Sequence, residues 1–183
     1  MARKDAKGRA DWLVAGARQL AKGGVESVRV EPIAKALGVT KGSFYWHFDK
    51  RRGWIDAILL AWEERSTLAV IRHVDEAALD ARERLLVLWS LNDDPEDVRF
   101  ELGVRDFATR NEDAATIVER VDTQRLKYLR RNFRALGLSP SDTEARCLLY
   151  YSLLIGDYFI APSHGRFSRD KVLQRGIDFL LEV

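Results

Sequence analysis

The sequence predicts an all-α protein of about nine helices. Apolar residues recur at helical spacing along almost the whole chain, and clusters of glycine, proline and small polar residues separate the helical runs. Strand-like alternation is confined to residues 27–30, which is too short to build a sheet. A chain of 183 residues is also long enough to bury a substantial apolar core.

The first predicted helix lies near the N-terminus. Leu13, Ala17 and Leu20 recur at helical spacing, and Gly23 and Gly24 follow where the helix should end. A longer helix begins after residue 49, where Asp49 is placed to cap it through its side chain. Its apolar stripe consists of Ile55, Ile58, Leu59 and Trp62.

Two further apolar stripes continue the helical pattern toward the C-terminus. The first contains Phe100, Val104 and Phe107, and the second contains Val172, Gly176, Ile177 and Leu180. Breaks are expected at residues 92–95, 137–140 and 161–165, each of which combines proline with polar residues or glycine.

Charge is distributed unevenly along the chain. Residues 1–52 contain 12 Lys/Arg and 5 Asp/Glu, a net charge of +7, whereas residues 53–183 contain 18 and 23, a net charge of −5. A basic segment joined to an acidic one is typical of a polyanion-binding module fused to a second functional part. The alternative is a solvated run of charge at the N-terminus.

Residues 33–48 have the pattern of two short helices joined by a sharp turn. Ile33 and Ala34 would face inward, and Ala34 is small, as required where a second helix crosses closely. Gly38 supplies the left-handed backbone that ends the first helix. Thr40 is placed to cap the second helix through its hydroxyl group.

The second helix of this pair should be very short, with Phe44 and Phe48 facing inward. The residues left on its outer face are small, basic or aromatic: Lys41, Gly42, Ser43, Tyr45, Trp46 and His47. This arrangement is typical of a helix-turn-helix whose second helix enters the major groove of DNA. The alternative is a plain helical hairpin, which would leave large aromatic side chains in solvent without a purpose.

The same residues resemble the N-terminal signature of the TetR family. That signature reads I-A, two to three residues, G-V-[ST]-x-G-x-[FL]-Y-x-H-F, and then Lys or Arg three residues on. It is matched by Ile33-Ala34, Gly38-Val39-Thr40, Gly42, Phe44-Tyr45, His47-Phe48 and Arg51. With its flanking helices, the resemblance covers about residues 7–62. It implies a three-helix DNA-binding domain over residues 1–52 and a ligand-binding and dimerisation domain over residues 53–183.

The resemblance also implies which residues contact DNA. By position these are Arg29, Thr40, Lys41, Gly42, Ser43, Tyr45, Trp46, His47 and Lys50. Lys50 is expected near a phosphate at the start of the fourth helix. Arg29 departs from the family, which usually has Thr or Ser at that position, so a charge contact is expected in place of a hydroxyl contact.

The C-terminal part resembles the family more loosely. Residues 105–108 and 118–129 look like the sixth and seventh helices of one TetR subgroup, which often carries the GSFYWHF form of the recognition helix. The candidate ligand-binding residues are aromatic or polar: Trp89, Phe100, Phe107, Arg125, Tyr128, Asn132 and Tyr151. The alternative for each aromatic residue is plain core packing.

The helix over residues 148–156 is apolar nearly all round, so it must be covered on more than one side. In the TetR family this helix and the last one pack against their symmetry mates as a four-helix bundle. The resemblance therefore implies a homodimer that binds a palindromic operator in double-stranded DNA and is released by a small-molecule effector. The alternative is burial within a single chain.

The sequence contains few features that would indicate a metal site, a catalytic site or a membrane-spanning segment. Cys147 is the single cysteine, which fits a reducing cytoplasm, and His47, His73 and His164 show no metal-ligand spacing. A phosphate loop and a nucleophile elbow are both missing. The longest apolar run, residues 148–161, is too short and interrupted to span a bilayer. We therefore expect a cytoplasmic protein without a signal peptide, metal, cofactor or enzymatic activity.

Three functions remain open at this point. The first is a ligand-responsive repressor, and the second is a DNA-binding regulator of the same fold without a small-molecule ligand. The third is a small enzyme with an incidental helix-turn-helix. A cavity in the C-terminal part favours the first, and a cluster of titratable groups with shifted pKa values would be needed for the third.

Overall fold

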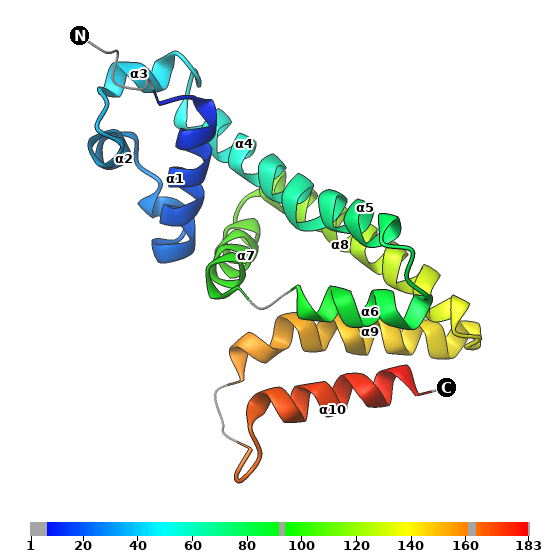
Figure 1. Cartoon of the computed structure of the whole chain (residues 1–183). Helices are drawn as coiled ribbons and strands as arrows, with labels where there is room; N and C mark the ends of the chain where they lie inside the picture. The colour runs from blue at the N-terminus through cyan, green and yellow to red at the C-terminus, as the bar shows by residue number, and fades with distance from the viewer. Residues whose placement is uncertain (1–6, 92–93, 161–163, 183) are drawn as a thin grey trace. The chain divides into compact units, whose positions relative to one another are not determined.

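The computed structural model describes residues 7–91, 94–160 and 164–182, which are almost entirely helical (Figure 1). Its elements are α1 (Arg9–Gly23), η1 (Val25–Ser27), α2 (Val30–Leu37), α3 (Lys41–Tyr45), α4 (Arg51–Glu63), η2 (Glu64–Leu68), α5 (Ala69–Glu76), α6 (Ala81–Ser90), α7 (Pro95–Ala108), α8 (Glu112–Ala135), α9 (Pro140–Gly156), η3 (Asp157–Phe159) and α10 (Arg169–Leu181). The predicted all-α class is confirmed. Extended pairing in these residues is limited to one bridge, between His164 and Phe167.

Helix α4 continues without a break through the single π-helical turn η2 into α5. Counted as one helix, this segment brings the number of α-helices in the described ranges to nine. Of the predicted breaks, residues 92–93 and 161–163 lie outside the described residues.

The chain divides into two compact units. Unit 1 consists of Met1–Leu68 and Asp94–Val121, and unit 2 of Ala69–Asp93 and Asp122–Val183. Helix α7 belongs to unit 1 because it packs along α1. These units are defined by which residues pack together. The predicted boundary after residue 52 instead separates two functions, and it stays a prediction.

Aromatic side chains form the centre of unit 1. Trp12 of α1, Phe44 of α3 and Trp54 of α4 are fully buried, with ring centroids 5.1–5.6 Å apart in edge-to-face arrangements. The Trp54 indole N–H donates to the Trp12 carbonyl at 3.1 Å. A Cβ on Gly16 would lie 2.5 Å from the Ile58 Cδ1 atom, so α1 and α4 cross closely because this residue is glycine.

The start of α4 differs from the prediction. The cap position is Lys50, with extended dihedrals of φ −144° and ψ 156°, and no side-chain hydrogen bond caps the helix. The prediction for Asp49 is wrong because Asp49 lies one residue before the cap position. The predicted apolar stripe of Ile55, Ile58, Leu59 and Trp62 is buried, as expected.

The last residue of α4 carries a charged contact within unit 1. Glu63 is only 6% exposed, and both of its carboxylate oxygens accept from Arg120 of α8, at 2.6 and 2.5 Å. The hydrogen bond to Glu63 raises the pKa of the Arg120 guanidinium. This bidentate pair holds the last residue of α4, one position before the π turn begins at Glu64.

Unit 2 has its own core, in which α9 and α10 lie side by side (Figure 1). Tyr150 of α9 is 1% exposed, and its hydroxyl donates to the Leu85 carbonyl at 2.7 Å. Burial raises the pKa of this phenol. The Tyr150 ring also contacts Phe133 and Trp89 edge to face, so three elements meet at one aromatic residue.

Candidate nucleic-acid interface

The turn between α2 and α3 has the geometry that the sequence predicts. Gly38 adopts the left-handed conformation with φ +71° and ψ 29°. The Val39 N–H donates to the Ala34 carbonyl at 3.0 Å, which closes the end of α2. Ile33 and Ala34 are buried on the inner side of α2. Helix α3 therefore leaves the turn in a fixed direction.

The outer face of α3 is exposed as predicted. Phe44 is fully buried and Phe48 is 6% exposed, and these two rings stack with centroids 5.4 Å apart. Tyr45 is 55% exposed and Trp46 is 87% exposed. Lys41 and Gly42 are exposed as well, and Ser43 and His47 are half-buried. The buried aromatic pair thus holds a short helix whose other side is open to a partner.

Lys41 has a partner that the sequence analysis missed. Its ammonium group lies 2.7 Å from the Glu31 carboxylate of α2. This hydrogen bond lowers the pKa of Glu31 and raises the pKa of Lys41. The pair spans ten residues and depends on the turn geometry, so spacing along one helix could not reveal it. Lys41 has to exchange this carboxylate for a DNA group if it contacts DNA.

Two of the predicted DNA-contacting residues, Thr40 and Arg29, lie at the starts of α3 and α2. Thr40 is the cap residue of α3, with φ −81° and ψ 156°, but its hydroxyl makes no capping hydrogen bond, so the prediction of a side-chain cap is wrong. Arg29 precedes α2, is exposed, and donates from Nε to the Glu26 carbonyl at 3.2 Å.

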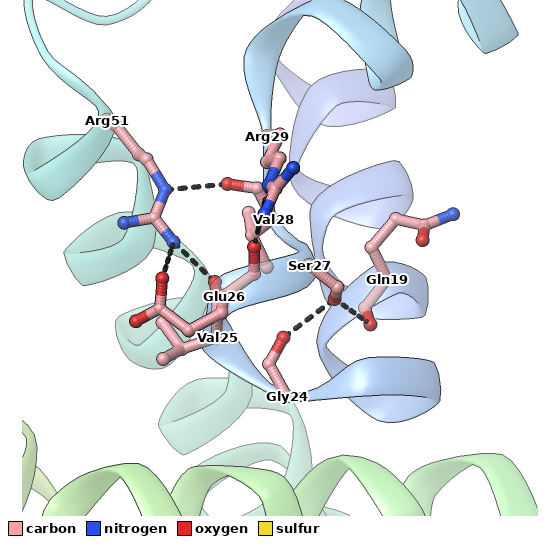
Figure 2. Close-up of polar contacts among 8 residues, drawn as sticks. All are labelled: Gln19, Gly24, Val25, Glu26, Ser27, Val28, Arg29 and Arg51. Carbon is pink, nitrogen blue, oxygen red and sulfur yellow. Dashed lines mark hydrogen bonds and ion pairs between the residues drawn. The ribbon is translucent and has the colours of Figure 1, made fainter.

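Three basic residues at the start of α4 have three different environments. Lys50 is exposed. Arg51 points back into unit 1, where Nε donates to the Val28 carbonyl at 2.7 Å and Nη2 to the Val25 carbonyl at 2.5 Å (Figure 2). Arg52 pairs with Asp113 of α8.

Arg51 therefore acts as an internal clamp between α4 and the segment before α2. Its Nη2 atom also lies 3.8 Å from the Glu26 carboxylate (Figure 2). The Ser27 hydroxyl lies 2.6 Å from the Gln19 carbonyl and 2.7 Å from the Gly24 carbonyl, which ties the same segment to α1. The sequence placed Arg51 in the signature but gave no sign of these carbonyl partners.

The candidate ligand-binding residues occupy several environments. In unit 1, Phe100 is buried beside Trp62 with ring centroids 6.3 Å apart, and Phe107 packs partly buried on the same core. In unit 2, the Tyr151 hydroxyl donates to Asp122 at 2.6 Å and lies 3.4 Å from an Arg125 nitrogen.

Tyr128 and Asn132 bond within unit 2. The Tyr128 hydroxyl donates to Asp75 at 2.8 Å, and the Asn132 amide donates to the Tyr128 carbonyl at 2.9 Å. Burial and the bond to Asp75 raise the pKa of Tyr128. Arg131 pairs with Asp75 and lies over the Tyr128 ring at 4.4 Å. These contacts account for both side chains without a ligand.

Trp89, the remaining candidate, lines a hollow of about 480 Å³ in unit 2, together with residues of α9, η3 and α10. Across the described parts of the chain, no three His, Cys, Asp or Glu side chains gather in a way that could hold a metal ion. Nor does any helix of those parts have the length and apolar character needed to cross a membrane.

Unit 1 thus contains a helix-turn-helix with an exposed second helix, the class of fold that binds DNA. Residues 13–58, which include this helix-turn-helix, match the N-terminal model of the family described as bacterial regulatory proteins, tetR family. None of the curated proteins matches the sequence. The subgroup suggested by the GSFYWHF segment stays a prediction.

Solved structures of transcriptional regulators share the fold over nearly the whole chain. A transcriptional regulator from Saccharomonospora viridis in complex with choline is 18% identical, with a TM-score of 0.79 and 94% of each chain covered. AibR in complex with isovaleryl coenzyme A and operator DNA is 18% identical, with a TM-score of 0.67, and 94% of this chain and 97% of that chain are covered. A ketosteroid transcriptional regulator of Mycobacterium tuberculosis is 18% identical, with a TM-score of 0.67 and coverages of 98% and 97%. The chain therefore has a TetR-like fold.

Proposed function

We propose that this protein is a ligand-responsive transcriptional repressor that binds palindromic operator DNA as a homodimer and is released by a small molecule. The observation that carries the proposal is the exposed face of α3, where Tyr45 and Trp46 project from a helix held by buried Phe44. Large exposed aromatic side chains beside a basic residue are costly in solvent, but they suit contact with bases and the thymine methyl group.

The proposed DNA contacts fall into two kinds. Lys50 and Arg29, both exposed, would bind phosphates and position the protein. The residues that would approach base edges or the adjoining backbone share α3 and its ends: Thr40, Lys41, Gly42, Ser43, Tyr45, Trp46 and His47. Lys41 would first release Glu31, so Glu31 competes with DNA for this ammonium group.

Exposed leucines and a phenylalanine of unit 2 support the proposed homodimer. Leu148 and Leu149 of α9 are 64% and 56% exposed, and Phe179 of α10 is 56% exposed. Burial within the single chain, the alternative that the sequence left open, does not cover these side chains. A second copy of α9 and α10 would cover them as a four-helix bundle.

The ligand part of the proposal is supported by the hollow beside Trp89, whose volume of about 480 Å³ falls in the range of small-molecule sites. Choline and isovaleryl coenzyme A are bound in two of the similar structures, which suggests that this chain too binds a small molecule. By linkage, ligand and operator should weaken each other's binding by the same factor, and a tenfold effect needs about 1.4 kcal/mol of coupling.

A second candidate is a DNA-binding regulator of the same fold without a ligand. It is favoured by the internal hydrogen bonds of Tyr128 and Asn132, which leave fewer polar groups for a ligand. A thermal-shift screen with small molecules separates the two candidates, because a repressor must gain stability from its effector.

Selection of bound duplexes from a random pool tests the DNA-binding part of the proposal. We expect a palindrome whose half-site centres lie about one helical turn or somewhat more apart. Trp46→Ala should change base preference or weaken specific binding by about 1–3 kcal/mol. Phe159→Ala removes another exposed aromatic side chain, 71% exposed in unit 2, and should change nothing. Failure to enrich any sequence, or equal effects of the two variants, would overturn the proposal.

A further inference from the structure

The hollow in unit 2 is lined by aromatic, apolar, polar and acidic side chains. Trp89 comes from the end of α6, Tyr158 from η3, and Asp170 from the first turn of α10, while Leu154 and Leu173 add apolar surface. Asp157, Ser90 and Gln174 complete the lining. The lining therefore combines two aromatic rings with two carboxylates and two neutral polar side chains, and none of the described residues that form it is a lysine or an arginine.

The two carboxylates are not equivalent. Asp157 is 17% exposed and pairs with Arg169, whose Nη2 lies 2.7 Å from its Oδ1 atom and whose Nε donates to it at 2.9 Å. Arg169 therefore neutralises Asp157 and holds it in place. Asp170 is exposed, and the described residues contain no cation within ion-pair distance of it. One negative charge thus remains at the hollow.

Part of the aromatic wall is also held in place. The Trp89 ring packs edge to face on Tyr150, with centroids 5.8 Å apart, and Tyr150 is itself buried in the core of unit 2. A ring fixed from behind loses little freedom when a ligand binds to its other side. Aromatic faces attract cations, and a carboxylate adds a direct charge interaction.

We propose that this hollow binds a small organic ammonium ion, with Asp170 supplying the charge and Trp89 and Tyr158 the aromatic contacts. A bare metal ion would not be held, because no group of three possible metal-ligating side chains occurs in the described ranges. A simple anion would meet the negative charge of Asp170. The proposal rests on the proposed function in one respect, since it identifies the chemical class of the effector.

Isothermal titration of the full-length protein with tetramethylammonium tests the site, with sodium chloride matched in every titration. The control ligand is 2,2-dimethylpropan-1-ol, which is nearly the same shape but neutral. We expect millimolar or tighter binding of the cation and binding of the alcohol weaker by about twofold to fivefold, the value of one exposed ion pair. No binding of the cation at millimolar concentration, or equal binding of the two compounds, would overturn the proposal.

Variants assign the binding to this hollow. Asp170→Asn should weaken cation binding by about twofold to fivefold, and Tyr158→Leu by about threefold. Glu144→Gln removes a carboxylate of α9 that pairs with Arg130 outside the hollow, and it should leave binding unchanged. Circular dichroism checks that each variant is folded. If Asp170→Asn and Glu144→Gln bind the cation equally well, the assignment is wrong.

A separate measurement keeps this proposal distinct from the repressor proposal. Operator binding of the ligand-free protein should be the same for Asp170→Asn and for the unmodified chain. Asp170 belongs to unit 2, whereas all the proposed DNA-contacting residues belong to unit 1. Cation binding without operator release would support the site and contradict the effector role. If neither the unmodified chain nor the variant binds DNA, the repressor proposal is contradicted. The titration result for the cation site is not affected by that outcome.

Discussion

Lys50, Arg51 and Arg52 show how neighbouring residues of one charge acquire separate roles. The cap position leaves the Lys50 side chain in solvent, whereas the next residue, Arg51, lies toward the segment before α2 and donates to two backbone carbonyls. Arg52 is the next residue of α4, and it forms an ion pair with Asp113. Of the three, Lys50 is best placed to bind a phosphate.

Lys50→Ala should weaken binding to all DNA sequences alike and reduce the slope of log affinity against log salt by about 1 unit. The reason is that Lys50 would neutralise one phosphate, so its removal reduces by one the number of counterions released from the DNA on binding. Affinity measured at several salt concentrations checks this. Lys127→Ala removes an exposed lysine of unit 2 and should leave the slope unchanged. An unchanged slope in Lys50→Ala would contradict its placement at the phosphate.

Arg51→Ala should lower the free energy of unfolding by about 2 kcal/mol, because two carbonyls lose a charged donor. It should also weaken operator binding, since the segment before α2 is no longer tied to α4. Urea denaturation and a binding isotherm measure the two effects. Arg52→Ala, which breaks an exposed ion pair, should cost less than about 1 kcal/mol. Equal losses in the two variants would show that the carbonyl contacts do not stabilise the fold.

At the scale of elements, the turn between α2 and α3 depends on one backbone conformation. Gly38→Ala places a Cβ at φ +71° and should destabilise the protein by about 1–2 kcal/mol. Gly38→Asn should cost less, because asparagine tolerates this conformation. Gly53 lies within α4 with open space at its Cβ position, so Gly53→Ala should stabilise by up to about 1 kcal/mol. Thermal unfolding of the three variants checks the order of stability.

The contact between α5 and α8 in unit 2 should make stability sensitive to acid. The hydrogen bond from Arg131 lowers the pKa of Asp75 below its ordinary value of 3.8. Since the unfolded chain then binds the proton more readily, this contribution is fully present above pH 3.8 and is lost as the pH falls through the lowered pKa of the folded state.

Unfolding free energies at several pH values should therefore show Asp75→Asn less stable than the unmodified chain above pH 3.8. The two unfolding free energies should converge below the lowered pKa of Asp75 in the folded state. The difference should stay under about 1 kcal/mol, because the Asp75 side chain is 36% exposed and solvent screens the pair. A difference that does not change with pH would contradict the role of the charge.

At the scale of the whole molecule, the proposed homodimer depends on the exposed apolar face of α9. Leu148→Glu should give a monomer in sedimentation experiments and a large loss of operator affinity, because two linked half-sites bind more tightly than one. Leu60→Glu changes a leucine of α4 that is 51% exposed, and it should remain a dimer. A monomeric unmodified protein that binds the operator tightly would contradict the bundle.

The sequence predicted much of the fold because helices and turns are local. Helical spacing located the stripe from Ile55 to Trp62, and Gly38 marked the turn, since both depend on residues within a few positions of one another. The same reasoning failed for helix capping. Asp49 and Thr40 are good capping residues by type, but capping depends on a one-residue register and on side-chain direction that residue type does not fix.

The sequence by itself thus determined the all-α class, the helix-turn-helix and the outward face of α3, because these follow from the local periodicity of apolar side chains and the backbone preferences of glycine. Only the tertiary structure decided that Arg51 clamps two carbonyls, that Glu31 holds Lys41, and that Tyr128 is satisfied by Asp75. Each of these contacts joins residues 10–53 positions apart, so it exists only after the helices have packed. The hollow beside Trp89 has the same origin, since its wall is assembled from the ends of separate helices.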